Sequence, residues 1–411
     1  MSRGLQSLLA AQFVSGLADN ALLLVAIACV LAEQGEAWLP PLLKLVFTLA
    51  YVVLAPFVGP LADRWPKARV MFVANALKAL ACAAMALGLP ALAAFTVAGI
   101  GAALYSPAKY GLVTELVPSH RLVVANAWLE VSTVVAILLG TLLGGGLTDQ
   151  PFVDAASVFV AQGLAVSLAV VLLLYVAAAA LNLRVPDSGC RYPPLPWRRQ
   201  WQGFVEDNRR LWRDPLGQVS LATTTLFWGI GAVLQFIALR WADERLGLAL
   251  SEAAYLQGLA AVGVIAGAAL AGRCVPLRQA PRVLGLGIVL GLLMPVMLVA
   301  ETVPQGALLL AAIGFAGGFF VVPMNALLQH RGVRLLSAGR SIAVQNFNEN
   351  ASVLVVLAFY TLSMAHGVSL PALLWSAGLA VAGAMALVAF RWRQIDAAAW
   401  QCDEAQQASS S

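Results

Sequence analysis

The sequence is poor in charge. Only 11% of its 411 residues are Asp, Glu, Lys or Arg, whereas an ordinary water-soluble domain has about a quarter. Hydrophobic residues make up 61% of the chain, and its mean hydropathy is +0.84. This composition excludes a water-soluble globular protein and predicts an integral membrane protein.

Cysteine and histidine are also scarce. The five cysteines show no Cys-x-x-Cys pair and no Cys/His spacing of the kind that binds a metal ion. The three histidines lie too far apart in the sequence to suggest a catalytic cluster. We therefore expect reduced cysteines that serve packing, no metal, no cofactor and no catalytic residue.

Long apolar runs fill most of the chain, and a helix needs roughly 20 apolar residues to cross the hydrocarbon core. The first run is too long for the core of a cleavable signal peptide, and the runs lack the alternation of an outer-membrane barrel. We predict an all-α membrane protein with twelve transmembrane helices; ten spans with re-entrant segments fit nearly as well. The runs are 8–31, 41–61, 70–88, 92–112, 124–147, 155–183, 216–240, 253–272, 283–300, 305–328, 342–365 and 370–390.

Two stretches far apart in the chain resemble each other. In both, an apolar run ends in Pro-x-Lys or Pro-x-Asn, a basic link follows, and the next run carries a Glu nine residues after an Arg. Pro107 and Pro323 are 216 residues apart, and Glu130 and Glu349 are 219 apart. A repeat of this length indicates two related halves. The predicted domains are a six-helix bundle over 1–183, a cytoplasmic linker over 184–215, a second six-helix bundle over 216–392 and a disordered cytoplasmic tail over 393–411.

Basic residues gather in alternate links. Of the 25 Lys and Arg, 20 lie at the two ends of the chain or in the links after the even-numbered runs up to the tenth. Only Arg245 lies in the other links. Because positive residues favour the cytoplasmic side, both termini of this multi-pass membrane protein are predicted to be cytoplasmic. The linker combines Arg with Trp, which is typical of a segment lying on an anionic leaflet.

A glycine-containing charged motif follows the second run. The residues Gly-Pro-Leu-Ala-Asp-Arg-Trp-Pro-Lys-Ala-Arg over 59–69 resemble the signature G-x-L-A-D-R-x-G-R-R of the major facilitator superfamily, whose members have two six-helix halves. Glycine allows helices to approach closely, and an Asp–Arg bond can latch the cytoplasmic side. Pro66 replaces the usual glycine, and the second half has no acid at the matching place. The predicted cytoplasmic gate is Gly59, Asp63, Arg64 and Arg69.

Several polar residues lie inside the apolar runs, where an ionised group costs a few kcal/mol or more and marks a site by default. Asp19 lies midway along the first run and shares a helix face with Gln12 and Ser15. An acid paired with a buried lysine purely for packing is the alternative, and Lys109 and Arg240 can instead extend to the membrane surface. The candidate binding residues are Asp19, Asn20, Lys78, Lys109, Glu130, Gln235, Arg240, Gln345, Asn346, Glu349 and Asn350.

Four stretches resemble a narrower family, the bacterial lysophospholipid transporters within the major facilitator superfamily. They are Ala-Gln-Phe-Val-Ser-Gly-Leu-Ala-Asp-Asn-Ala-Leu-Leu over 11–23, Tyr-Ser-Pro-Ala-Lys-Tyr-Gly over 105–111, Gly-Gly-Phe-Phe-Val-Val-Pro-Met-Asn-Ala-Leu-Leu-Gln over 317–329 and Ala-Val-Gln-Asn-Phe-Asn-Glu-Asn over 343–350. The resemblance runs from about residue 8 to residue 392.

This resemblance implies movement of lysophosphatidylethanolamine and lysophosphatidylglycerol from the outer to the inner leaflet of the inner membrane. It also implies alternating access with a polar site between the halves, and a partner lysophospholipid acyltransferase/acyl-carrier-protein synthetase that re-acylates the lipid. Acids such as Asp19 and Glu349 can meet an ammonium group, and Lys78, Lys109 or Arg240 can meet a phosphate.

Two other functions compete with lysophospholipid transport. A drug or small-amphiphile efflux carrier would share the same fold, and fold alone does not separate the two. A membrane-bound acyltransferase would need a nucleophile and a base close together. His120 and His330 have no Asp at short spacing, so an enzyme is disfavoured. Energy coupling, head-group preference and oligomeric state stay open.

Overall fold

The computed structural model describes residues 3–32, 39–157, 163–193 and 196–410, and every regular element within these ranges is a helix. Short 3-10 turns, among them η1 (Ser119–Arg121) and η3 (Leu277–Val283), connect some of the helices. The helices are α1 (Arg3–Ala32), α2 (Leu39–Arg64), α3 (Lys67–Ala86), α4 (Ala91–Leu116), α5 (Leu122–Thr148), α6 (Gln150–Ser157), α7 (Gly163–Asn182), α8 (Gln200–Arg213), α9 (Pro215–Leu246), α10 (Leu250–Cys274), α11 (Leu284–Val296), α12 (Val303–Leu335), α13 (Ala338–Ala365) and α14 (Leu370–Ser410).

Twelve stretches of the described residues are helical, long and apolar enough to cross a membrane. They confirm the all-α prediction with twelve spans over the alternative with ten. The run that carries Asn126 and Glu130, in α5, and the run that carries the polar residues 345–350, in α13, are unbroken helices. On α13, the side-chain amides of Asn348 and Asn350 each donate to the carbonyl four residues earlier, over 2.8 Å. Such bonds satisfy the amide groups within the helix, so that polar residues do not interrupt the span.

The chain forms two compact units that interleave along the sequence. The first consists of Met1–Pro118, Val131–Val205 and Leu336–Asn350, and the second of Ser119–Glu130, Glu206–Leu335 and Ala351–Ser411. Each unit therefore includes one short segment from the opposite half of the sequence. In the first unit this segment is the beginning of α13, and in the second it is η1 with the beginning of α5.

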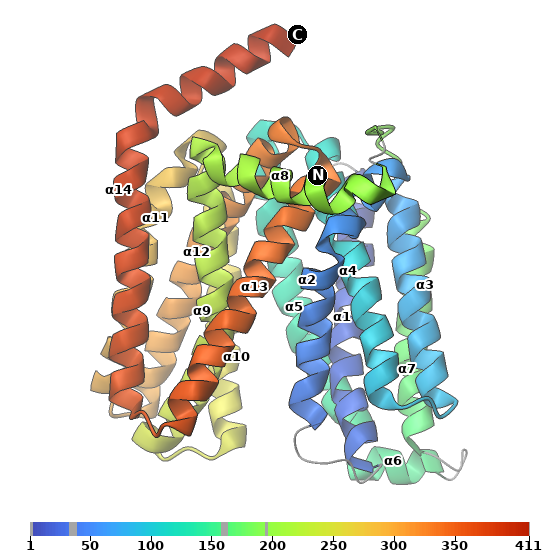
Figure 1. The fold of residues 1–411 in the computed structure, drawn as a ribbon. Coiled ribbons are helices and arrows are strands. Elements are labelled where there is room, and N and C mark those ends of the chain that lie inside the picture. The colour runs from blue at the N-terminus through green and yellow to red at the C-terminus, as the bar shows by residue number, and fades with distance from the viewer. Residues whose placement is uncertain (1–2, 33–38, 158–162, 194–195, 411) are drawn as a thin grey trace. The chain divides into compact units, whose positions relative to one another are not determined.

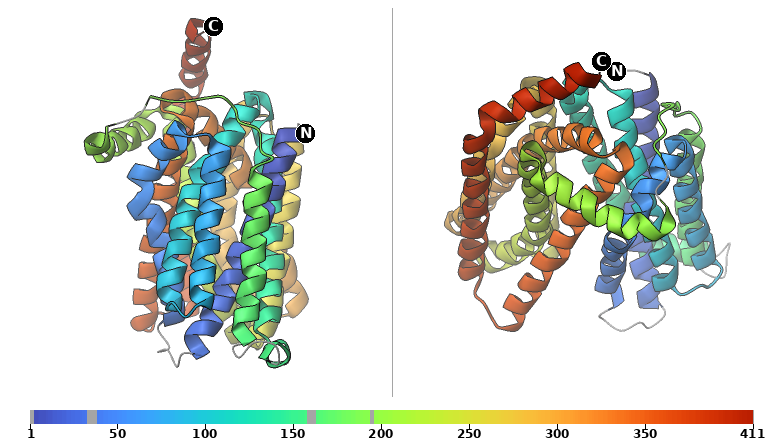
Figure 2. Two further views of the ribbon diagram at one scale, coloured as in Figure 1. Left: turned by 90° about the vertical axis from the view of Figure 1, so that its right-hand side faces the viewer. Right: turned by 45° about the horizontal axis from the view of Figure 1, so that its top comes forward.

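The first unit is built around α1, α2, α3, α4 and α7, which lie side by side (Figure 1 and Figure 2). α3 packs against α4 and α7, α7 also packs against α1, and α4 against α2. Alanines dominate the core, and Leu22, Phe95 and Tyr175 are among its bulky members. A Cβ on Gly99 of α4 would lie 3.1 Å from the backbone of Phe47 in α2. The missing side chain therefore permits these two helices to approach closely.

The second unit is built around α9, α10, α11, α12 and α14. α10 packs along α12, α11 packs along α14, and both α12 and α14 contact α9. In its core, the indole Nε1 of Trp241 donates to the carbonyl of Met297 over 2.6 Å. Gly267 of α10 and Gly318 of α12 lie so close to the backbone of the opposite helix that no side chain would fit. Small residues are what allow this close packing.

α8 occupies the predicted linker. It exposes the indole of Trp201 and the guanidinium groups of Arg209, Arg210 and Arg213, while Phe204 is buried. Exposed Trp and Arg on one short helix are typical of a segment that lies in the interface of an anionic leaflet. The membrane-surface role of the linker stays a prediction.

The structure differs from the sequence prediction at the C-terminal end. The tail over 393–411 was expected to be disordered, whereas α14 continues as a helix to Ser410. This part of the sequence is rich in alanine and glutamine, which are strong helix formers and favour continuation of the preceding span.

Candidate functional site

An ion pair lies inside the membrane-spanning part of the first unit. Asp19 on α1 and Lys78 on α3 face each other, with 2.8 Å between Oδ2 and Nζ. The phenol of Tyr175 on α7 donates to the other carboxylate oxygen, Oδ1, over 2.8 Å. Because α7 packs against both α1 and α3, the three helices bring these side chains together. Each charge has an opposite partner, which lowers the cost of placing it in the membrane.

Lys78 is enclosed on all sides. Its ammonium lies 3.3 Å from Oγ of Ser15, 5.1 Å from the ring centroid of Tyr105 and 5.7 Å from that of Tyr175. Aromatic faces attract cations at such distances. The Lys78 side chain is 1% exposed, whereas that of Asp19 is 23% exposed. The carboxylate is therefore the more exposed member of the pair, and Lys78 is its counter-ion in this structure.

A second polar group lies where α13 joins the first unit. The side-chain amide of Gln345 donates to Oε1 of Glu349 over 2.8 Å, along the helix face that their spacing indicated. The amide of Asn346 donates to Oγ of Ser106 on α4 over 2.9 Å. Gln345, Asn346 and Glu349 are all buried. This group provides amide and carboxylate oxygens near the N-terminal end of α13.

The other predicted binding residues of the first unit make local contacts. Asn20 donates to the carbonyl of Gly16 over 2.8 Å, and Asn350 likewise bonds within its own helix. Lys109 is half-buried, with its ammonium 4.2 Å from the ring centroid of Tyr110. These contacts stabilise α1, α4 and α13 but do not join the Asp–Lys pair described above.

Three predicted binding residues belong to the second unit. Glu130 on α5 is buried, and Gln235 on α9 is exposed. Arg240 pairs with Glu244 one turn later on α9 and donates to the carbonyl of Val368 over 3.2 Å. These bonds hold the guanidinium of Arg240 at the end of α9, as expected of a residue that extends toward the membrane surface.

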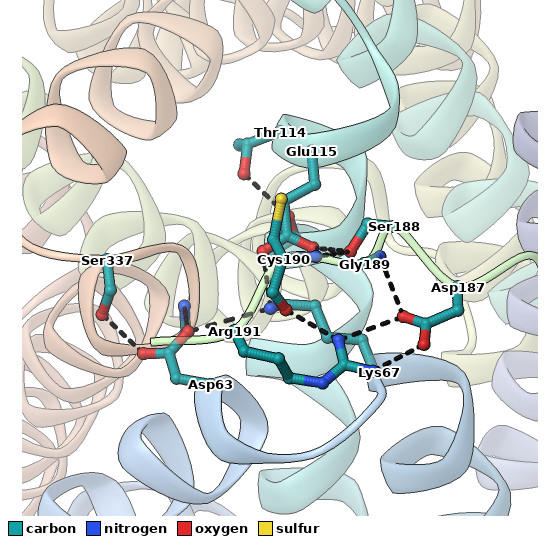
Figure 3. A network of polar contacts seen from close by, with 12 residues as sticks. Asp63, Lys67, Thr114, Glu115, Asp187, Ser188, Gly189, Cys190, Arg191 and Ser337 are labelled. Atoms are coloured by element: carbon teal, nitrogen blue, oxygen red, sulfur yellow. Dashed lines mark hydrogen bonds and ion pairs between the residues drawn. The ribbon is translucent and has the colours of Figure 1, made fainter. Parts of the chain in front are cut away.

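A set of contacts, called the latch below, joins the end of α2 to the beginning of α13 within the first unit; it consists of Gly59, Asp63, Ser337, Gly339 and Arg340. The Asp63 carboxylate accepts a hydrogen bond from the hydroxyl of Ser337 at 2.5 Å (Figure 3). It also accepts from the backbone N–H groups of Gly339 at 2.7 Å and Arg340 at 3.1 Å. An acid at a helix N-terminus satisfies unpaired N–H groups and the helix dipole. A Cβ on Gly59 would lie 3.0 Å from Cα of Arg340, so glycine permits the contact.

Lys67 forms ion pairs with Asp63 of the latch and with Glu115. Its ammonium lies 2.6 Å from Oε1 of Glu115 and 3.8 Å from Oδ1 of Asp63, and all three side chains are at most 4% exposed. The ring of Tyr192 covers the ammonium at 5.3 Å. One cation faces two carboxylates here, so the positive N-terminal end of α13 supplies the remaining favourable potential.

The segment over 187–192, called the strap below, contacts this network (Figure 3). The hydroxyl of Ser188 donates to Oε2 of Glu115 over 2.5 Å, and the backbone N–H of Tyr192 donates to the carbonyl of Asp63 over 3.4 Å. Burial and the nearby carboxylates of Glu115 and Asp63 raise the pKa of the Tyr192 phenol above its ordinary value. The phenol therefore stays neutral in the physiological range, and the strap carries no titrating group at its contact with Asp63.

The outer edge of the strap holds a local ion pair. Arg191 donates to both carboxylate oxygens of Asp187, at 3.1 and 2.5 Å, and the N–H of Gly189 donates to Oδ1 at 3.1 Å. The hydrogen bond from Arg191 lowers the pKa of Asp187 below its ordinary value of 3.8. Both side chains are largely exposed, so the pair adds little stability. Gly189 has φ of +75°, which suits the tight turn between the two partners.

The latch differs from the Asp–Arg bond that the motif predicted. Arg64 and Arg69 are both exposed, and the Asp63 carboxylate accepts hydrogen bonds from Ser337, Gly339 and Arg340 at the beginning of α13. The reason is geometric. Asp63 points toward the open end of α13, where several N–H groups lie within reach at once, whereas the arginines gain more from water than from burial.

The second unit contains a related contact at the beginning of α5. Asn126 of α5 and Gln329 of α12 exchange two amide hydrogen bonds of 2.8 and 2.9 Å, and both residues are buried. A Cβ on Gly272, at the end of α10, would lie 2.5 Å from Cβ of Ala127. The beginning of α5 therefore packs on a glycine of α10, as the beginning of α13 packs on a glycine of α2.

Several contributing residues were not predicted from the sequence. Tyr175 is an aromatic residue with a polar hydroxyl within the apolar run of α7. This is a weak signal that could have indicated a polar contact. Glu115 closes the repeated stretch around Pro107, but its spacing to Lys67 gives no hint of contact. Ser188 has no local signal. In the second unit, Arg331 on α12 binds Asp214 through two hydrogen bonds of 2.8 and 2.7 Å, and this pairing is equally invisible in the sequence.

Comparison with known proteins identifies the family to which this fold belongs. The family model described as Major Facilitator Superfamily matches residues 8–355. The chain belongs to the major facilitator superfamily. Within this superfamily it is 40% identical over 366 residues to the lysophospholipid transporter LplT of Cronobacter sakazakii, with 88% of this chain and 89% of that protein covered. It is 39% identical over 395 residues to LplT of Citrobacter koseri, with 95% of each chain covered.

Solved structures of the superfamily share the fold. The human organic anion transporter MFSD10 gives a TM-score of 0.71 at 16% identity, covering 95% of this chain and all of that one. A bacterial homologue of the iron transporter ferroportin gives 0.70 at 19% identity, with 96% and 100% covered. At such low identity the likeness concerns the fold alone. The family and its relatives confirm a multi-pass membrane transporter rather than an enzyme, and they confirm the resemblance seen in the four sequence stretches.

Proposed function

We propose that this protein moves lysophospholipids, chiefly lysophosphatidylethanolamine and lysophosphatidylglycerol, from the outer to the inner leaflet of the bacterial inner membrane by alternating access. The observation that carries this proposal is 40% identity over 88% of the chain to a protein named for lysophospholipid transport. Re-acylation of the delivered lipid by a partner lysophospholipid acyltransferase/acyl-carrier-protein synthetase completes the proposal.

The chemistry of the first unit supports such a substrate. A lysophospholipid has a phosphate, a polar or cationic head group and one acyl chain. The exposed edge of the Asp19 carboxylate is suited to a head-group ammonium, and charge-assisted hydrogen bonds of this kind are roughly twice as strong as neutral ones. Lys109 and Arg240 remain the proposed phosphate contacts, while the enclosed Lys78 serves as counter-ion to Asp19.

The latch supports alternating access. Access from the cytoplasm requires that the beginning of α13 leave Asp63, so the hydrogen bonds to Ser337, Gly339 and Arg340 are broken and remade in each cycle. The latch lies beside a concentration of basic residues in the sequence, which supports the assignment of this side and of both termini to the cytoplasm.

The proposal is tested in liposomes. The purified protein is reconstituted, and labelled lysophosphatidylethanolamine is followed between leaflets, with and without a pH gradient. Asp19→Asn is compared with the parent and with Asp149→Asn, which alters an exposed acid between α5 and α6. We expect fast movement by the parent and the control, and at least tenfold slower movement by Asp19→Asn.

Three results are informative. Loss confined to Asp19→Asn supports both the lipid function and a site at Asp19. Equal movement by all three proteins supports the lipid function and reduces Asp19 to a packing role. No movement by a folded parent, under either pH condition, refutes lysophospholipid transport and favours efflux of another amphiphile.

A further inference from the structure

Tyr175 and Asp19 make a contact that packing alone does not require. An ionised carboxylate offers about four acceptor positions. Lys78 occupies one on Oδ2, and the Tyr175 hydroxyl occupies one on Oδ1, each over 2.8 Å. The Tyr175 side chain is fully buried, and so is Lys78. The remaining acceptor positions belong to Asp19, whose side chain is 23% exposed and is the partly exposed member of the group.

We propose that Tyr175 is a positioning residue for head-group selection: its hydroxyl and the Lys78 ammonium fix the Asp19 carboxylate so that its exposed edge receives a donor-bearing, cationic head group. This inference rests on the proposed lysophospholipid transport. It assigns no substrate contact to Tyr175 or Lys78, because both are enclosed. Of these three residues, Asp19 is the one that touches the ligand.

The arrangement restricts how the carboxylate can turn. Oδ1 is held from α7 and Oδ2 from α3, so rotation about the Cβ–Cγ bond would break both bonds at once. Without the hydroxyl, the carboxylate keeps only the bond to Lys78 and is free to turn both oxygens toward that cation. A carboxylate turned in this way offers less to an incoming ammonium, because its acceptor positions already face the lysine.

The fixed edge offers acceptors only. An ammonium head group supplies several N–H donors and a positive charge, whereas a glycerol head group supplies neutral hydroxyl donors, whose bonds to a carboxylate are weaker. The effect of Tyr175 should therefore depend on the head group. That dependence separates positioning from general stability, which would affect both lipids alike.

The test is Tyr175→Phe, which removes the hydroxyl and keeps the ring that lies 5.7 Å from the Lys78 ammonium. The matched control is Tyr360→Phe, which alters a tyrosine stacked on Phe236 in the second unit. Initial rates with labelled lysophosphatidylethanolamine and lysophosphatidylglycerol give KM and kcat for each lipid. We expect KM for the ethanolamine lipid to rise about fivefold to tenfold, with a change below about twofold for the glycerol lipid and for kcat.

A double-variant comparison adds a second readout. If Tyr175 acts through Asp19, then Tyr175→Phe should change nothing further in an Asp19→Asn background, because coupled residues are not additive. Equal losses for both lipids, additive effects in that background, or an unchanged KM in folded Tyr175→Phe would each overturn the inference. A parent that moved neither lipid would instead refute the proposed function and this inference with it.

Discussion

Replacing Asp63 with asparagine is expected to release the latch. The substitution keeps the shape of the side chain but removes its charge and one of its two acceptor oxygens. Asp63 accepts three hydrogen bonds from the beginning of α13 and is 3% exposed. An asparagine amide group would place an N–H donor against backbone N–H donors, so at least one of these bonds is lost.

The magnitude follows from the bonds that are lost. One hydrogen bond to a charged acceptor contributes about 1.5–3 kcal/mol, and a charge at a helix N-terminus contributes about 0.3–1 kcal/mol. We therefore expect the latched state to lose about 2–4 kcal/mol relative to the released state. Since each 1.4 kcal/mol is a factor of about ten, the released population should rise about 30-fold to 700-fold.

The assay measures access to Ser106, which lies on α4, is buried and accepts a hydrogen bond from Asn346 of α13. Ser106→Cys is introduced into a chain whose five native cysteines have been replaced. Inside-out vesicles are treated with a membrane-impermeant maleimide. When release is rare and fast, the labelling rate follows the released population, so Asp63→Asn should label at least 30 times faster than the parent, by the estimate above.

Arg64→Gln is the matched control, because Arg64 is the exposed neighbour of Asp63 and takes no part in the latch. It should label at the parent rate. If Asp63→Asn labels no faster than Arg64→Gln, the bonds to α13 do not hold the cytoplasmic side and the reasoning fails. Faster labelling in both variants would instead support the hypothesis, drawn from the sequence motif, that an Asp–Arg bond holds this side closed.

Three further changes test other parts of the structure. Gly59→Leu should release the same latch by steric clash, because even a Cβ would lie 2.8 Å from the facing side chain of α13; unchanged labelling of the reporter cysteine would contradict this. Ser188→Ala removes one hydrogen bond to the buried carboxylate of Glu115 and should loosen the strap. We expect tryptic cleavage after Arg191 in inside-out vesicles to be about threefold to tenfold faster than in the parent. Equal cleavage rates, quantified by mass spectrometry, would show that the bond does not hold the strap. Asn126→Leu leaves a buried amide on α12 without its partner and should lower the free energy of unfolding by about 1–3 kcal/mol; a melting temperature in detergent equal to that of the parent would argue against a structural role for the amide pair.

The membrane architecture could be predicted from the sequence because the bilayer imposes simple requirements. A span needs a minimum apolar length, and its backbone must bond within itself, so hydropathy alone located all twelve stretches. The repeat around Pro107 and Pro323 pointed to two related halves, and the motif over 59–69 pointed to a latch at the end of α2. Asp19 could be singled out because an unpaired charge in the membrane is costly.

The partners of these residues could not be predicted in the same way. Helix spacing shows which residues share a face, as it did for Gln345 and Glu349, but it carries no information about which helix lies opposite. The sequence left open which acid Lys78 would neutralise, and the fold placed it against Asp19 and between aromatic rings. Tyr175 gained its role only because α7 packs against both α1 and α3.

The amino-acid sequence by itself determined the number of spans, the repeat and the positions of the costly charges, since each of these depends on local composition and the solvent around it. The tertiary structure decided that Asp63 binds the beginning of α13 rather than an arginine, and that Asp19 is the accessible half of its ion pair. These features depend on hydrogen-bond geometry between segments up to 277 residues apart, and such geometry exists only once the helices have packed.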